Sequence, residues 1–335
     1  MDAAMIWEWV IKSVVIILVM TGGFAYVTWY ERRVLARMQV RIGPNRVGWQ
    51  GLLQPVADGI KLIFKEELIP AGADKLIFVL APVITVIPAL IVTAVIPWGS
   101  TVELFGRSVS LQLADINVGV LYILSVTSIS IYGITLAGWS SNNKYAMLGG
   151  LRATAQMISY ELALGMSFVG PILWAGSMCM NTIVEAQKGL WFVFIMPVSF
   201  VIFVIASLAE VNRSPFDMPE AEQELTAGYH AEYSSMKFAL FFMAEYIKMI
   251  AVSMIGASLF LGGYQGPFID VLPGLGPVYL FIKVALWLFF MIWVRATLPR
   301  FRYDRLMAFG WKVLVPLSLF SIVITAVLRL LVTGG

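Results

Sequence analysis

The residues of this chain that could do chemistry are acids gathered in one short segment. Six carboxylates lie between residues 210 and 232 beside a single arginine, Arg213: Glu210, Asp217, Glu220, Glu222, Glu224 and Glu232. Pro, Phe, Met, Leu and Tyr alternate with them, which indicates packing, although a charge run is usually a solvated loop. Closely packed carboxylates cannot all ionise near neutral pH, so some keep their protons. The segment therefore predicts either a solvated acidic loop or a proton relay.

Further ionisable residues stand inside apolar runs. Glu161, Glu245 and Lys248 each lie well within a hydrophobic stretch. Charges at such depth are costly and normally face a protein interior or water. Glu245 and Lys248 are three residues apart, so they could simply neutralise each other on one helix face. Glu161 has no local partner and is therefore the better candidate for a protonatable position.

The composition indicates which elements hold these acids. Of the 335 residues, 60% are hydrophobic and only 13% are charged, whereas soluble domains carry about 45–50% apolar and about 25% charged residues. One cysteine and one histidine exclude an internal disulfide, a cysteine-bound iron–sulfur cluster and paired haem ligands on this chain. No GxGxxG motif or P-loop is present, so no nucleotide site is indicated. The chain is a polytopic membrane protein.

We predict an all-α fold with eight transmembrane helices and both termini on the outer side. The chain forms a single membrane domain, residues 1–335. Its apolar runs are long enough to cross about 30 Å of hydrocarbon and lie at 10–30, 76–98, 118–139, 153–175, 190–209, 238–262, 278–298 and 311–328. Most Lys and Arg fall in the loops after the odd-numbered spans, and the positive-inside rule therefore makes that side cytoplasmic. The acidic loop, about 210–237, lies on that side. Alternation around Arg107 predicts a small outer hairpin over 102–113.

Residues of about 50–68 form a separate element. Leu53, Val56 and Ile60 recur at helical spacing, and Gln54, Asp58 and Lys61 form a polar stripe on another face. This predicts an amphipathic helix at the membrane interface. Its polar stripe either faces water, as in a lipid-surface anchor, or faces an enclosed chamber. The preceding RIGPNR run, 41–46, is either a positive flank or a wall for a polar headgroup.

Several long motifs resemble one known family. These are YERRVLARMQ at 30–39, RIGPNR at 41–46, QPVADGIK at 54–61, AEVNRSPFDMPEAEQE at 209–224, AEY at 244–246 and PRFRYD at 299–304. In this order they are similar to the H subunit of bacterial respiratory complex I, the counterpart of mitochondrial NADH dehydrogenase subunit 1. The resemblance covers nearly the whole chain.

The resemblance implies a site and a set of partners. Arg32, Arg41, Asp58 and Lys61 are expected to line or support a quinone tunnel. The acids of the 210–232 segment would lead away from the tunnel, and Glu161 and Glu245 would continue the route into the membrane. No cofactor is expected on this chain, because FMN and the iron–sulfur clusters belong to partner subunits and the quinone is the substrate. Expected partners are the quinone-module subunits of the peripheral arm, the small and antiporter-like membrane subunits, the quinone and the lipid bilayer, but no nucleic acid. The location implied is the bacterial inner membrane.

The expected function is quinone binding and energy coupling in a proton-translocating NADH:quinone oxidoreductase. Two-electron reduction of a quinone creates negative charge, which acts strongly on nearby groups in a dry chamber. Coupled carboxylates can convert that charge into proton movement. Two alternatives stay open. One is the equivalent subunit of a membrane-bound hydrogenase or of a ferredoxin- or deazaflavin-linked complex. The other is a stand-alone proton-coupled transporter, although no internal repeat of the kind common in transporters is evident.

Overall fold

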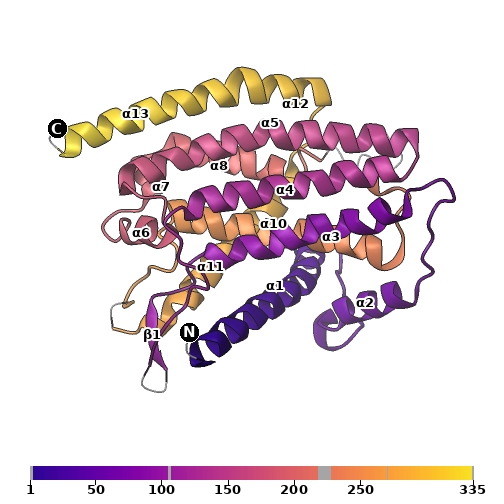
Figure 1. Ribbon diagram of the computed structural model, residues 1–335, viewed down its shortest axis with the longest axis horizontal. Helices are drawn as coiled ribbons and strands as arrows, with labels where there is room; N and C mark the ends of the chain where they lie inside the picture. Colours follow the sequence, from indigo (N-terminus) through magenta and orange to yellow (C-terminus); the bar gives the residue numbers. More distant parts are fainter. Residues whose placement is uncertain (1–2, 105–106, 218–227, 270, 334–335) are drawn as a thin grey trace.

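The structure, a computed structural model, describes residues 3–104, 107–217, 228–269 and 271–333, and these residues form a mainly helical bundle (Figure 1). Seven helical segments in this part of the chain are long and apolar enough to cross a membrane. They contain α1 (Ala3–Met38), α3 (Lys75–Ile91), α4 (Gly119–Ser140), α5 (Lys144–Ala175), α10 (Ser235–Phe260), α11 (Gly276–Thr297) and α13 (Val315–Thr333). A 3-10 turn, η2 (Val92–Val95), extends α3, whereas α12 (Tyr303–Phe309) and a π-helical turn, η5 (Gly310–Leu314), lead into α13. The polytopic helical fold is confirmed.

The fifth expected span, 190–209, is not one continuous helix. It is divided into α7 (Phe192–Ile195) and α8 (Pro197–Glu210), after the short helix α6 (Met180–Glu185). Met196 has φ −131° and ψ 63°, outside the helical region, because the ring of the following Pro197 disfavours helical backbone at the residue before it. The described residues therefore contain seven helices of spanning length, not the eight that we predicted, together with this broken segment.

Both chain ends lie at the same end of the bundle, on the left of Figure 1. The hairpin of β1 (Thr101–Leu104) and β2 (Arg107–Ser110) lies there too, with Thr101 opposite Ser110. A strand pair was expected at this place. The apolar helix α8 is too short to be counted among the seven, so an eighth passage through the membrane stays a prediction. Which side of the membrane this end faces stays a prediction.

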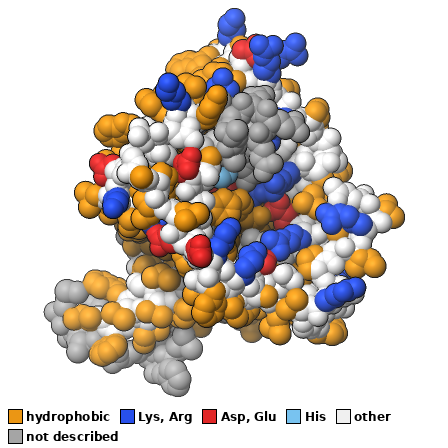
Figure 2. Space-filling view, turned by 90° about the vertical axis from the view of Figure 1, so that its right-hand side faces the viewer, with side chains coloured by type: hydrophobic (Ala, Val, Ile, Leu, Met, Phe, Trp, Pro, Cys, Tyr) orange, Lys and Arg blue, Asp and Glu red, His pale blue; other side chains and the backbone are white. Residues whose placement is uncertain are grey.

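The opposite end carries α2 (Gln54–Phe64), which lies off the bundle at the lower right of Figure 1. The helix falls inside the expected range of about 50–68, and none of its residues is buried. The end of α2 and the segment after it both contact the start of α10, since Ser235 donates a hydrogen bond to the Leu62 carbonyl (2.9 Å) and Lys237 pairs with Glu67. Figure 2 looks onto this end and shows Lys and Arg side chains spread across it.

Helices α3 and α4 pack closely because one contact residue has no side chain. A Cβ on Gly133 of α4 would lie 2.1 Å from Oγ1 of Thr85 and 2.8 Å from the Ala81 carbonyl oxygen. Small residues let helix backbones approach each other in membranes, where lipid removes most of the hydrophobic drive for association. This approach carries Thr85 to the wall of the cavity described below.

Candidate functional site

A buried carboxylate that accepts no hydrogen bond from the described residues lies at the end of α8. Glu210, the last residue of α8, is 2% exposed, and neither of its carboxylate oxygens accepts a hydrogen bond from any described residue. Lys248 of α10, also buried, attracts its charge, and Glu161 of α5 is close enough to repel it. A buried charge is tolerated only with compensation of this kind. Glu210, Lys248 and Glu161 therefore form one electrostatic unit, which we call the central acid–base group.

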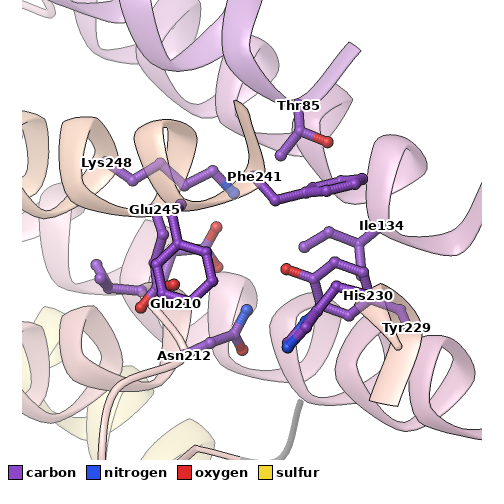
Figure 3. Close-up of a pocket in the computed structure, with 11 residues that line it drawn as sticks. Thr85, Ile134, Glu210, Asn212, Tyr229, His230, Phe241, Glu245 and Lys248 are labelled. Carbon is purple, nitrogen blue, oxygen red and sulfur yellow. The ribbon is translucent and has the colours of Figure 1, made fainter. Parts of the chain in front are cut away.

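A narrow cavity opens beside this group. It has a volume of about 20 Å³, enough for a single water molecule. In Figure 3, Lys248, Glu245 and Glu210 lie on one side of the cavity. Tyr229 and His230, from the 3-10 turn η3 (Gly228–His230), lie on the other side. Thr85, Asn212 and four apolar side chains complete the wall, so a proton could reach Glu210 or Glu245 here without bulk water entering.

A second, smaller cavity lies beside the same group. It has a volume of about 10 Å³, and its wall includes Glu210, Lys248, Thr127 and Ser130. The neighbouring Ser128 of α4 donates a hydrogen bond to Glu161. Hydroxyl groups both donate and accept protons. This cavity therefore lies between Glu210 and α4, the helix whose Ser128 contacts Glu161.

The backbone after α8 stays inside the protein instead of emerging into solvent. Gln156 of α5, fully buried, donates from its amide nitrogen to the carbonyls of Ala209 (3.0 Å) and Phe216 (2.7 Å). It therefore satisfies carbonyl oxygens that the end of a helix leaves without partners. Gln156 thereby fixes the position at which α8 ends and Glu210 stands.

Four charged residues, of which Glu31 and Arg213 are buried, form a network next to this turn. Arg213, 3% exposed, pairs with Glu245 (Nε to Oε1, 2.7 Å) and with Glu31 of α1 (3.3 Å). Arg295 of α11 pairs with Glu31 as well. The guanidinium carbon of Arg213 lies 4.4 Å from the ring centroid of Tyr246. Burial alone would lower the pKa of Arg213, but Glu245 and Glu31 raise it well above its ordinary value, so this cation is permanent.

The charges of this network balance. Two arginines face two glutamates, Glu31 and Glu245, and they come from α1, α10, α11 and the segment after α8. Glu245 belongs both to the network and to the wall of the cavity beside Glu210. We call Glu31, Arg213, Glu245 and Arg295 the arginine network. Glu245 is therefore the residue that the arginine network shares with the wall of that cavity.

The structure brings together some of the expected relay acids and separates others. Glu210 and Glu245 line one cavity, and Glu161 stands beside them. Asp217 is buried but pairs with Arg300 (3.0 Å) at the bundle end. Glu232 accepts a hydrogen bond from Asn143 (2.7 Å). The remaining three expected acids lie outside the described residues: Glu220, Glu222 and Glu224.

Three of the four expected quinone residues meet at α2. Arg32 of α1 donates to Asp58 (2.7 Å), and Lys61 lies 3.6 Å from the same carboxylate. Burial alone would raise the pKa of Asp58, but the hydrogen bond and charge of Arg32, helped by Gln54 and Lys61, lower it. Asp58 is therefore an anion at neutral pH. Arg41 does not join this group, because it lies exposed in the loop and donates to Gln39 (2.6 Å).

Sequence reasoning missed the arginine network. The first span was expected to end at residue 30, one residue before Glu31, and Arg213 was noted only as the single cation among acids. That isolation was the available signal, because one cation enclosed by acids is a natural centre for an ion network. In the described residues, no group of three or more His, Cys, Asp or Glu side chains could hold a metal ion.

The fold and these buried charges define a helical membrane protein with an enclosed acid–base system. Residues 11–326 match the family model described as NADH dehydrogenase, and the chain belongs to this family. It is 52% identical to the NADH-quinone oxidoreductase H subunit of Thermomicrobium roseum, over 94% of both chains. It is 53% identical to the H subunit of Protochlamydia amoebophila (90% of this chain, 91% of the relative) and 50% identical to the second H subunit of Geobacter metallireducens (95% and 94%). The family resemblance of the sequence motifs is confirmed.

Proposed function

We propose that the chain is the quinone-binding and energy-coupling membrane subunit of a proton-translocating NADH:quinone oxidoreductase. Family membership and near full-length relatives named as the H subunit of NADH-quinone oxidoreductase support the enzyme class. The observation that carries the coupling role is the isolation of Glu210, an acid buried without a hydrogen-bond partner among the described residues, beside a lysine and a cavity of single-water size. Such a group exchanges a proton in response to nearby charge.

The quinone site lies where α1 meets α2. Arg32 and Asp58 form its polar wall, Lys61 adds a second cation, and the exposed apolar face of α2 offers a surface to the isoprenoid chain. A quinone that gains two electrons becomes negatively charged and attracts cations and protons. Its reduction therefore pulls the Arg32 guanidinium toward it. The side chain of Glu31, next to Arg32 in sequence, lies in the arginine network.

The coupling route follows these contacts. Reduction of the quinone perturbs Arg32 and hence Glu31, whose balance with Arg213 then changes. Glu245 transmits the change to the central acid–base group, where Glu210 gains or loses a proton against Lys248. Glu161 and the hydroxyls of α4 carry the proton toward neighbouring subunits. Asp217, Glu220, Glu222, Glu224 and Glu232 complete the acidic side of the route, and Arg41 supports the loop at the tunnel wall.

The partners follow from this role. The redox groups, FMN and iron–sulfur clusters, belong to peripheral-arm subunits, and the pumping channels belong to small and antiporter-like membrane subunits. The compartment is the bacterial inner membrane, since the relatives reported above are bacterial.

The decisive experiment replaces one oxygen of the central acid. Glu210→Gln keeps the shape but removes the exchangeable charge, so quinone reduction and proton pumping in inverted membrane vesicles are expected to fall together by about tenfold or more. The matched control is Glu185→Gln, an exposed acid on α6 at the other end of the bundle. If Glu210→Gln assembles and retains both rates, the coupling role is wrong.

A further inference from the structure

A wide apolar groove lies at the end of the bundle that holds both termini, far from α2. Its volume is about 840 Å³, within the range of small-molecule sites. One wall is a single stripe of α1 from Trp7 to Val19, and the other is the segment 109–113 that leaves the hairpin. Trp7, Ile11 and Val15 are 64%, 58% and 50% exposed. Three successive turns of α1 therefore present large apolar side chains to whatever fills the groove.

The depth of this groove follows from helix geometry. Lys12 and Arg32 are twenty residues apart on α1, about 30 Å, which equals the thickness of the hydrocarbon layer. Arg32 lies at the charged end of the bundle, so Lys12 lies at the opposite boundary. From Trp7 to Val19 the stripe runs about 18 Å, close to the roughly 15 Å of one leaflet. The groove thus begins at headgroup level and ends near the midplane.

Polarity changes along the groove in the same direction. Its charged residues, Glu8 and Lys12, pair at 2.5 Å and lie at the boundary end. Below them the α1 stripe continues as Val15, Ile16 and Val19. An amphiphile of one leaflet has this gradient. A transmembrane helix as occupant is less suitable, because helix interfaces in membranes are enriched in small residues and this stripe has none.

The charge of the pair selects a headgroup. Glu8 and Lys12 together are neutral, with one site for an anion and one for a cation. A phosphate beside Lys12 and an ammonium beside Glu8 match both. We propose that the groove binds a phospholipid with a zwitterionic amino headgroup, of the phosphatidylethanolamine type, with an acyl chain lying along α1.

The test uses the intact complex in vesicles that contain a photoactivatable phospholipid. With the diazirine in an acyl chain, phosphatidylethanolamine is expected to label the peptides spanning 7–19 and 109–113. Labelling should exceed that by the matching phosphatidylglycerol probe about two- to fivefold, the scale of one exposed ion pair. Equal labelling of the groove and of the exposed face of α13 would show ordinary lipid contact and overturn the proposal.

A matched pair of variants tests the headgroup selection. Glu8→Gln gives the pair a net positive charge, so the preference is expected to reverse toward phosphatidylglycerol while quinone reduction is unchanged. Glu103→Gln, on an exposed acid of β1 that does not line the groove, should leave the preference as it was. An unchanged preference in Glu8→Gln contradicts the selection. A photo-crosslinking amino acid at Ile11 that captures a neighbouring subunit would identify a protein occupant and overturn the proposal.

Discussion

At the scale of single residues, Arg213 is the cation that joins the most partners in the site. It connects two glutamates from different helices and lies against an aromatic ring. Breaking a buried ion pair by removing one partner leaves an uncompensated charge, which costs about 3–5 kcal/mol. Lysine cannot replace it, since a single ammonium lacks the planar fork that reaches two carboxylates.

Removal of the Arg213 charge is therefore expected to destabilise the complex. Arg213→Met removes the cation that pairs with both Glu31 and Glu245 and should lower the unfolding free energy by about 3–5 kcal/mol, measured as a lower thermal midpoint of the purified complex. Adding Glu245→Gln restores charge balance and should recover part of the loss, as a double-mutant cycle would quantify. Strictly additive effects of the two substitutions would contradict the network.

The pH response of the α2 site depends on Arg32. Because the pKa of Asp58 is lowered, its ion pair contributes fully above the unfolded value of about 3.9 and is lost as pH falls through the lower folded value. Arg32→Gln removes the main lowering influence, so the pKa of Asp58 rises. The acid limb of the quinone-reduction profile should therefore move to higher pH. Arg33→Gln, whose partner is Gln50 (2.8 Å), serves as the control; an equal shift in both variants contradicts the assignment.

Sequence could identify these residues only in part. Glu161, Glu210 and Glu245 were found because acids in apolar runs are conspicuous, and Asp58 because it lies on a polar stripe. The arginine network could not be found in this way, because Glu31 and Arg213 are 182 positions apart and Glu31 and Arg295 are 264 apart. Only the folded chain determines which distant charges meet.

At the scale of elements, local signals predicted the helices better than their interruptions. The spans at α1, α3, α4, α10 and α11 follow from apolar length alone. Pro197 was the available signal for the break at Met196, but the prediction used only the length of the apolar run. That break lets α8 end inside the bundle, and the ending positions Glu210.

The contact between α3 and α4 gives the element-scale prediction. Gly133→Ala would bring a methyl group against Thr85 and the backbone of α3, and overpacking of this kind costs about 1–3 kcal/mol. We expect a lower thermal midpoint and reduced assembly of the complex. Gly165→Ala on α5, where the nearest atom is 3.6 Å from the added carbon, should be neutral or slightly stabilising. Equal loss in the two variants would show that helix contact is not the cause.

At the scale of the whole molecule, the arrangement separates two regions of different chemistry. The end with α2 holds the charged residues through which a quinone and its partners are expected to act (Figure 2). The opposite end holds the termini, the hairpin and the apolar groove (Figure 1). The arginine network and the central acid–base group lie between the two. Ion pairs join Glu31, Arg213 and Glu245, and Glu245 lines the same cavity as Glu210. The proposed coupling between the two regions would act through these residues.

The orientation of the whole molecule is testable by labelling from one side. The distribution of Lys and Arg predicts that the end with the termini faces outward. The natural Cys179 at that end is a poor reporter, because it is buried and donates to Asp115 (3.0 Å). In a Cys179→Ser background, Lys188→Cys should react with an impermeant maleimide in intact cells, and Lys75→Cys only in inverted vesicles. Both lysines are exposed. Lys188 lies between α6 and α7, and Lys75 begins α3 at the other end of the bundle (Figure 1). The reverse pattern would invert the orientation and place the α2 site on the outer side, where a cytoplasmic electron donor could not reach it.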